Sequence, residues 1–587
     1  MKIPYNEIRI FSLIISILCI EFTSFYFNIT GGPTAVMSAI VVSQSFIGAQ
    51  YLKARNRIIG TILGVIVSFI SAHLFAGNEI YFLAFSMLWI SFMAVMTSLV
   101  PTDNSHLFQL GANTYAFVAI PLIEDPGNTY FNLISRSTGV IMGVVILVTI
   151  SVLLLLKGSD YNIKSSVRNI YRNTLKIRTK IKSSTEIDKS EIKLYFYDVL
   201  NIVANKKNVI YEHGLGFKSS TALKTISIMS MMLFLYSNTL RHYIQSGDNS
   251  PGRIQKDYLK IIKKALSSRD NFNKFNHHKV KRINIFSEHK SVAEAARRGT
   301  RALVITGILL TIWFVTGWSS GHVMVSMGVV YMILLTTYPS PVSGGKYMVY
   351  GTVLGMITGW AFIQSIYSSS YTFTSPSLFF IAQLPVLIFG SRWLFVGKTF
   401  LLGVTFLTTF YFGVQPSNLT VVSYHIFMEN CLGATAGLII TGLGISIILP
   451  ERKFTTNEHL IKITMQDVIH SLSTKELNIS KVVKHMHDRL RLSDSLKKFT
   501  SDDFIFLTNL SSLYIIIHYI IEENESNIIT DIVLKQLNQW LETNEIMIEN
   551  ETKMRLENLI DSEEGEIKKL SICAYNILKE MKEIYEN

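Results

Sequence analysis

The chain repeats one pattern of apolar and polar segments along its length. Six hydrophobic stretches are followed by a polar segment with helical periodicity, and the same order then returns. The sequence Gly-Thr-Ile-Leu-Gly at 60–64 comes back as Gly-Thr-Val-Leu-Gly at 351–355. Many transporters build a path between two such related halves. The pattern predicts an all-α polytopic membrane protein with two repeats of six transmembrane helices, each repeat followed by a cytoplasmic helical domain.

The apolar residues lie in runs long enough to cross a bilayer. Of the 587 residues, 17% are charged, against about 25% in soluble domains. The first run is longer than the apolar region of a signal peptide, about 7–15 residues, and lacks a clear cleavage site, so we expect a retained helix. Since about 20 apolar residues span a bilayer, the predicted spans are 8–27, 33–50, 57–76, 80–100, 106–122, 135–156, 301–317, 321–338, 347–366, 376–391, 396–414 and 427–449.

Positive charges are unevenly distributed over the predicted loops. The net charge of +13 alone could suggest a nucleic-acid partner. However, Lys and Arg are confined to alternate loops, while the other loops hold Glu79, Glu124 and Asp125 and no basic residue. This positive-inside bias favours the lipid bilayer over nucleic acid as the partner and places both termini in the cytoplasm. Arg136, just inside the sixth span, is the one exception.

The same alternation divides the chain into four predicted domains. Residues 1–157 and 297–450 form six-helix membrane domains, and residues 158–296 and 451–587 form cytoplasmic helical domains. The segment 221–244 is unusually apolar, so it is either the central helix of a soluble bundle or a thirteenth span. An odd number of crossings would break the charge asymmetry, which favours the bundle.

Glycines recur four residues apart in the third and sixth span of each half. Such pairs lie on one helix face and let two backbones approach closely. A single pair is common in membrane helices, but four copies at equivalent places are far more specific. The predicted helix-packing residues are Gly60, Gly64, Gly139, Gly143, Gly351, Gly355, Gly433 and Gly437.

These segments resemble the fusaric acid resistance, or aromatic acid exporter, family. The resemblance covers nearly the whole chain and rests on residues 57–64 and 351–355 and on Asn-Thr-Tyr-Ala at 113–116. It implies a multi-pass protein of the bacterial inner membrane that uses protons to export small anionic aromatic acids. It also implies a periplasmic membrane-fusion adaptor as a partner, and we further expect a homo-oligomer. Related families include anion channels, which leaves the mode of transport open.

The fifth span carries a polar stripe. Thr102, His106, Gln109 and Asn113 are spaced to lie on one helix face, with Asp103 beside His106. The stripe either lines a cavity or makes hydrogen bonds between helices. Asp103 and His106 could exchange protons near neutral pH, or Asp103 could cap the helix at the membrane surface.

Other ionisable groups inside spans are functional candidates because their burial is costly. Glu21 could couple transport to protons, or pair with a polar group of a neighbouring helix. Arg136 could bind a substrate carboxylate, or pair with Glu124 or Asp125. The proton-coupling candidates are therefore Glu21, Asp103, His106 and Glu429, and the substrate-pathway candidates are Gln109, Asn113, Arg136 and Asn430.

No motif in the sequence indicates an enzyme. There is no P-loop, H-E-x-x-H or G-x-S-x-G pattern, so we expect no catalytic site, no cofactor and no ATP-driven pump. Cys19, Cys431 and Cys573 predict neither a disulfide framework nor a metal site. The alternatives to an exporter are a passive anion channel and a membrane-anchored scaffold.

Overall fold

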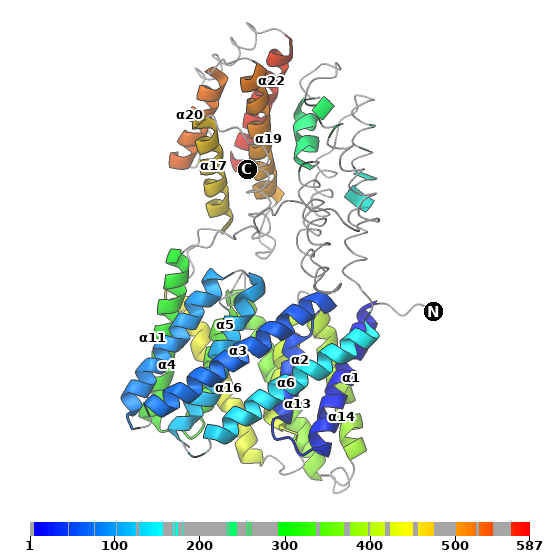
Figure 1. Ribbon diagram of the computed structural model, residues 1–587, viewed down its shortest axis with the longest axis vertical. Coiled ribbons are helices and arrows are strands. Elements are labelled where there is room, and N and C mark those ends of the chain that lie inside the picture. The colour runs from blue at the N-terminus through cyan, green and yellow to red at the C-terminus, as the bar shows by residue number, and fades with distance from the viewer. Residues whose placement is uncertain are drawn as a thin grey trace. The chain divides into compact units, whose positions relative to one another are not determined.

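The computed structural model divides into two compact units (Figure 1). Unit 1 comprises Met1–Gly158 and His289–Glu451, and unit 2 comprises Ser159–Glu288 and Arg452–Asn587. Every regular element in the described residues is a helix, so the predicted all-α class is confirmed. The structure describes residues 5–44, 46–75, 77–100, 102–124, 127, 129–155, 168–170, 172–173, 176, 179, 232, 234–243, 254, 256–257, 260, 292–335, 341–368, 376–396, 399–416, 423–449, 456–474, 501–523, 528–543 and 565–586.

The first half contributes six α-helices and one short 3-10 helix to the described part of unit 1. Local signals mark their ends: Pro33 lies in the first turn of α2, and the Asn78 side chain accepts a hydrogen bond from the Tyr81 backbone N–H at the start of α4. The helices are α1 (Tyr5–Tyr26), α2 (Gly32–Val42), α3 (Ile47–Leu74), α4 (Glu79–Leu99), α5 (Thr102–Ala119), η1 (Ile120–Ile123) and α6 (Thr129–Leu154).

The second half repeats this order. Gly317, with φ of +59°, follows the first of its helices in a left-handed conformation that suits glycine. The Ser423 side chain caps the last helix by accepting from the Ile426 backbone N–H. The helices are α11 (Val292–Thr316), α12 (Gly321–Leu335), α13 (Pro341–Ser368), α14 (Pro376–Phe395), α15 (Phe400–Val414) and α16 (Tyr424–Ile447).

Helix packing follows the same rules in both halves. Within each half the third helix packs on the fifth and the second on the sixth, as α3 on α5 and α13 on α15, and as α2 on α6 and α12 on α16. Between the halves, α1 contacts α14 and α4 contacts α11, while α2 contacts α15 and α5 contacts α12. The repeated sequence therefore folds into a repeated arrangement in which each half completes the other.

Two hydrophobic cores hold unit 1 together, and each draws on both halves. One joins Ile90 of α4 and Tyr115 of α5 to Leu309 of α11 and the largely buried helix α12. The other joins Ile17 of α1 to Leu387 of α14 and Phe410 of α15. The two membrane segments predicted from the sequence thus form one compact unit with shared cores, while the four-domain division remains a prediction.

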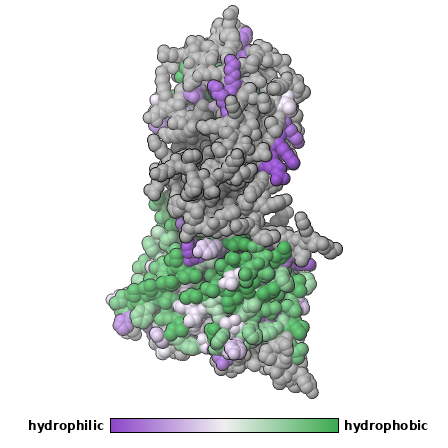
Figure 2. Space-filling view, turned by 45° about the vertical axis from the view of Figure 1, so that its right-hand side comes forward, coloured by the Kyte–Doolittle hydropathy of each residue, from purple (hydrophilic) through white to green (hydrophobic). Residues whose placement is uncertain are grey.

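The surface of unit 1 is apolar (Figure 2). Every exposed large apolar side chain in the described part of the chain belongs to this unit, including Phe22, Leu153 and Val315. A surface of this kind is stable against lipid rather than water. Seven of the described helices, α1, α3, α4, α6, α11, α14 and α16, contain a segment long and apolar enough to cross a membrane. The count of six spans in each half therefore remains a prediction.

Unit 2 joins the polar segments that follow the two halves. Residues 234–243 are buried, and Asn238 Nδ2 lies 3.1 Å from Asn509 Oδ1 and 2.9 Å from Ser512 Oγ. The described part of the apolar segment 221–244 therefore packs inside unit 2. The helices of unit 2 in the described residues include α17 (Thr456–Ser473), α19 (Ser501–Glu523), α20 (Ile528–Thr543) and α22 (Gly565–Glu586).

Polar contacts in unit 2 are buried and specific. Arg241 Nη2 lies 2.8 Å from Glu580 Oε2 on α22. The Tyr519 hydroxyl donates a hydrogen bond of 2.8 Å to Asp257 Oδ2, and burial raises the pKa of Tyr519, which keeps the hydroxyl a donor. These contacts connect residues more than 250 positions apart, so both segments are needed to complete the unit.

Candidate functional site

A carboxyl group is buried where the two halves of unit 1 meet. Glu21 on α1 is 2% exposed, and its Oε2 atom accepts a hydrogen bond from Nε2 of Gln383 on α14. Gln383 Oε1 accepts in turn from the hydroxyl of Tyr411 on α15, at 2.7 Å. Glu21 Oε1 is buried and has no hydrogen-bond partner in the described residues. One oxygen of the carboxyl group is thus held by the opposite half, while the other remains unsatisfied.

The packing of α1 on α14 and of α14 on α15 creates this network. The sequence shows Gln383 as a polar residue inside a span, but nothing in it connects Gln383 with Glu21. Sequence reasoning does not identify Tyr411 as a functional candidate, because a tyrosine in an aromatic-rich helix resembles a packing residue. The second half carries no equivalent carboxyl group, since residues 302–316 of α11 contain no ionisable side chain.

The polar stripe on α5 is partly bonded to itself. His106 Nδ1 lies 3.0 Å from Gln109 Oε1. His106 Nε2 and Asn113 Oδ1 are buried atoms without a hydrogen-bond partner in the part of the chain that the structure describes. The side chains of Thr102 and Asp103 lie outside the described residues, so the predicted pairing of Asp103 with His106 stays a prediction.

Basic side chains from two other helices approach this stripe. Lys53 and Arg57 of α3 both interact electrostatically with His106. Arg57 also interacts with Arg136 of α6. Arg57 is 5% exposed, and its Nη2 atom donates to Ser38 Oγ of α2 at 3.1 Å. Arg57 therefore lies within electrostatic range of Lys53, of His106 on α5 and of Arg136 on α6, and we call these four residues the basic cluster.

Arg136 does not form the predicted ion pair with Glu124. Its guanidinium group instead lies over the ring of Phe117, 4.5 Å from the ring centroid. Glu124 Oε2 lies 2.9 Å from Nδ1 of His322, which comes from the opposite half. Glu124, which the sequence suggested as a partner of Arg136, therefore pairs with His322 instead. The other predicted partner, Asp125, lies outside the described residues.

The carboxyl group of the second half has a different setting. Glu429 Oε2 accepts hydrogen bonds from Ser319 Oγ at 2.8 Å and from Ser320 Oγ at 2.6 Å. These serines precede α12, so Glu429 anchors the start of α16 to the turn between α11 and α12. Asn430 is half-buried beside it. Glu429 is therefore separate from the Glu21 network and from the basic cluster.

The glycine pairs lie where two backbones meet. A Cβ atom at Gly64 would approach Gly111 O of α5 to 2.8 Å, and one at Gly355 would approach Phe406 O of α15 to 2.6 Å. At Gly143 the nearest atom would be Ala35 O of α2, and at Gly437 it would be Met324 O of α12. The four pairs pack against α2, α5, α12 and α15. These four helices also join the halves, because α2 contacts α15 and α5 contacts α12.

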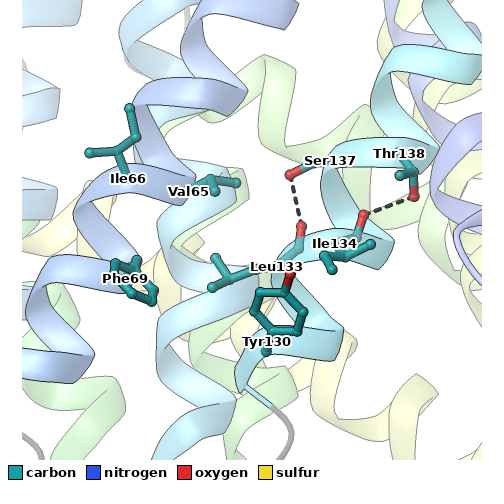
Figure 3. A pocket seen from close by; sticks show the side chains of 8 residues that line it. All are labelled: Val65, Ile66, Phe69, Tyr130, Leu133, Ile134, Ser137 and Thr138. Carbon is teal, nitrogen blue, oxygen red and sulfur yellow. Dashed lines mark hydrogen bonds between the residues drawn. The ribbon is translucent and has the colours of Figure 1, made fainter.

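An apolar groove lies between α3 and α6 (Figure 3). It has a volume of about 370 Å³ and is lined by exposed side chains such as Ile66, Phe69 and Tyr130. The hydroxyls of Ser137 and Thr138 donate to carbonyl oxygens of their own helix, at 2.7 and 2.8 Å. The groove therefore offers apolar contact and little polar recognition. Within the described residues, no group of three or more His, Cys, Asp or Glu side chains could hold a metal ion.

Curated proteins similar to this chain include two named transporters, and no solved structure matches it. The p-hydroxybenzoic acid efflux pump subunit AaeB of Pectobacterium parmentieri is 20% identical over 534 residues, covering 79% of this chain and 78% of that protein. The uncharacterized transporter YdhK of Escherichia coli K12 is 32% identical over 112 residues, 18% of this chain and 16% of that protein. The model of the fusaric acid resistance protein family matches twice, at residues 13–277 and 254–502. These matches confirm the resemblance found in the sequence, and the chain belongs to the fusaric acid resistance protein family.

Proposed function

We propose that this protein exports small aromatic or amphipathic carboxylic acids across the bacterial inner membrane in exchange for protons. The observation that carries the proposal is the Glu21 carboxyl group, buried at the contact between the halves and bonded to Gln383 of the other half. Membership of the family, and similarity to a p-hydroxybenzoic acid efflux pump subunit, support the substrate class.

Glu21 suits proton coupling because its charge state affects how the halves fit together. An ionised carboxyl group in apolar surroundings carries a large free-energy cost, and taking up a proton removes that charge. Gln383 and Tyr411 both belong to the second half, so a change in the charge of Glu21 acts directly on α14 and α15 of that half. A proton entering from one side would then favour one arrangement of the halves, as alternating access requires.

The proposal extends to partners and orientation. The similar AaeB protein is named a pump subunit, which supports a periplasmic adaptor as a further component. The confinement of Lys and Arg to alternate loops supports cytoplasmic termini and a cytoplasmic position for unit 2. A homo-oligomer remains part of the proposal.

The proposal is tested with the full chain reconstituted in vesicles that are loaded with 4-hydroxybenzoate. An imposed pH gradient should accelerate efflux, and a protonophore should remove that acceleration. Glu21→Gln should keep the hydrogen bond to Gln383 with a neutral group and lose the response to the gradient. Glu79→Gln is the matched control, since Glu79 is exposed in the first turn of α4.

Two outcomes would contradict the proposal. Efflux by the unchanged protein that ignores collapse of the gradient would exclude proton coupling. A Glu21→Gln protein that still responds fully to the gradient would exclude Glu21 as the coupling group, whatever the substrate.

A passive anion channel is the second candidate, and the basic cluster favours it. Lys53, Arg57 and Arg136 could attract anions into a conducting path, as charged side chains do in anion pores. Steady currents in symmetric chloride or malate, recorded without a proton gradient, would support the channel. Zero current together with gradient-driven efflux would support the exporter.

A further inference from the structure

Within the described residues, the basic cluster has positive charge without a matching negative charge. Among the residues that the structure describes, no carboxylate lies within ion-pair distance of Lys53, Arg57 or Arg136. Arg57 interacts with Lys53 on its own helix and with Arg136 on α6, and these are like charges. Buried charges in proteins are normally paired, so an arrangement of this kind leaves a demand for an anion.

Unused hydrogen-bonding atoms point to the same demand. The Nε atoms of Arg57 and Arg136 are buried and have no hydrogen-bond partner in the described residues. Arg57 is more than nine-tenths buried, and its side-chain hydrogen bond to Ser38 Oγ uses Nη2 and leaves Nε unused. Guanidinium groups present donors in a fork that matches a carboxylate. The available donors therefore match an oxyanion better than a neutral ligand.

Aromatic rings border the cluster. Phe117 lies beneath Arg136 and is 6.5 Å from the ring of Phe412 on α15, in the opposite half. Lys53 Nζ lies 5.7 Å from the ring centroid of Phe400, which is at the opposite end of α15, about 18 Å from Phe412 along the helix. An anion bound at Arg136 would thus have the rings of Phe117 and Phe412, one from each half, beside it, and aromatic pairs prefer edge or offset contacts.

We propose that Arg57 and Arg136 form a carboxylate-binding site inside the first half, and that Phe117 and Phe412 pack against the ring of an aromatic acid. Lys53, one helical turn before Arg57, adds positive charge at a distance. The site rests on the proposed function for its substrate class. Because the rings of α15 reach it from the second half, ligand binding would change contacts between the halves that Glu21 also affects from α1.

The second half has no copy of this site. Arg57 stands three residues before Gly60, and the equivalent residue before Gly351 is the buried Met348. Arg136 stands three residues before Gly139, and the equivalent residue before Gly433 is Asn430. The proposal therefore includes a stoichiometry of one carboxylate for each chain, despite the repeated architecture.

The test is equilibrium binding to the full chain in nanodiscs, with no pH gradient, by calorimetry. Benzoate should bind with one site for each chain. Benzamide, which has the same shape without the charge, should bind at least about tenfold more weakly, because bonds to charged groups are the stronger ones. Cyclohexanecarboxylate should fall between them if the rings of Phe117 and Phe412 contribute. Competition with chloride and with inorganic phosphate shows whether the site selects a carboxylate or accepts any anion.

Variants test the location of the site. Arg57→Gln and Arg136→Gln should each weaken benzoate binding about tenfold or more. Arg136→Lys should recover part of the loss, because it restores the charge without the fork. Arg392→Gln is the matched control: Arg392 is an exposed arginine in the last turn of α14, and its removal changes the net charge equally.

Equal binding of benzoate and benzamide by the unchanged protein would overturn the proposal, and this comparison needs no variant to fold. Equal weakening by Arg392→Gln would overturn it as well, as would two sites for each chain. Carboxylate binding that persists while gradient-driven efflux fails would leave this site standing and remove proton-driven export. Efflux that persists in a protein without measurable benzoate binding would do the reverse.

Discussion

The Glu21 carboxyl group accepts a hydrogen bond from the Gln383 amide across 362 positions of the chain. The two residues belong to α1 and α14, which pack together where the halves meet. Gln383 is in turn bonded to Tyr411 of α15. This network is the most deeply buried polar link between the halves that involves a carboxyl group, and its energetics can be measured.

Gln383→Leu should lower the stability of unit 1 by about 1–3 kcal/mol, because it removes the amide that donates to Glu21 and accepts from Tyr411. Thermal unfolding of the detergent-solubilised protein checks this. Replacing all three residues, by adding Glu21→Leu and Tyr411→Phe, should recover much of the loss, since removing every partner is close to neutral. The control is Gln364→Leu, at an exposed position of α13. A triple variant less stable than Gln383→Leu alone would contradict this account.

Gly437→Ala should destabilise the protein by about 1–3 kcal/mol, because the new methyl group would overpack the contact between α16 and α12. The added Cβ would meet Met324 O and would lie 2.9 Å from Gly328 N. Gly442 lies in the same helix and has nothing within 4 Å of such an atom. Gly442→Ala should therefore be neutral or slightly stabilising, as helix propensity predicts. Size-exclusion chromatography after heating measures the fraction of each variant that stays monodisperse. An equal loss of this fraction for both variants would argue against close packing at Gly437.

Glu580→Ala should weaken unit 2 by about 3–5 kcal/mol, because it leaves the Arg241 charge buried and unpaired. Arg241 is 4% exposed and lies 2.8 Å from Glu580. Hydrogen exchange of the full chain should show faster exchange in α19 and α22. Lys260→Ala is the control: Lys260 is 79% exposed in its pair with Asp257, so its loss should cost about 0–1 kcal/mol. Unchanged protection of α22 in Glu580→Ala would exclude the buried pair as a stabilising contact.

Cys573 should resist alkylation in the folded protein. Burial raises the pKa of its thiol, and the nearby charge of Arg241 opposes this only in part. The thiolate is the reactive form, so raising the pH from 7 to 9 should increase labelling much less than for a free cysteine, and unfolding should restore normal labelling. Cys19→Ser/Cys431→Ser isolates Cys573 for a maleimide assay. Labelling at the rate of a free thiol would show that α22 is not packed over it.

Much of the fold can be read from the sequence, because hydrophobic length and periodicity are local properties. The predicted span 57–76 corresponds to α3, which begins ten residues earlier and ends two residues earlier, and the span 347–366 lies within α13. Ends are harder to predict: α2 and α15 are shorter than their predicted spans, 11 and 15 residues long. A run of apolar residues continues past the point where the backbone turns, so hydropathy alone overestimates such helices.

The candidate site is less predictable, because partners come from packing between distant helices. His106 and Gln109 could be placed on one face, and they do form a hydrogen bond. The approach of Arg57 to the same region could not be foreseen, since the positive-inside bias explains a basic residue at that end of a span equally well. Glu124 as a partner for Arg136 was a reasonable expectation from sequence distance, but His322 of the other half takes that carboxylate.

The sequence by itself determined the helical class, the doubled order of segments, the glycine faces and the family. Each of these depends on residue type and local spacing, which a chain carries before it folds. Only the tertiary structure decided that Glu21 meets Gln383, that Arg57 approaches Arg136 and that Arg241 pairs with Glu580. Each contact joins helices that are distant in the sequence, and it depends on which helix faces pack together, which local spacing does not encode.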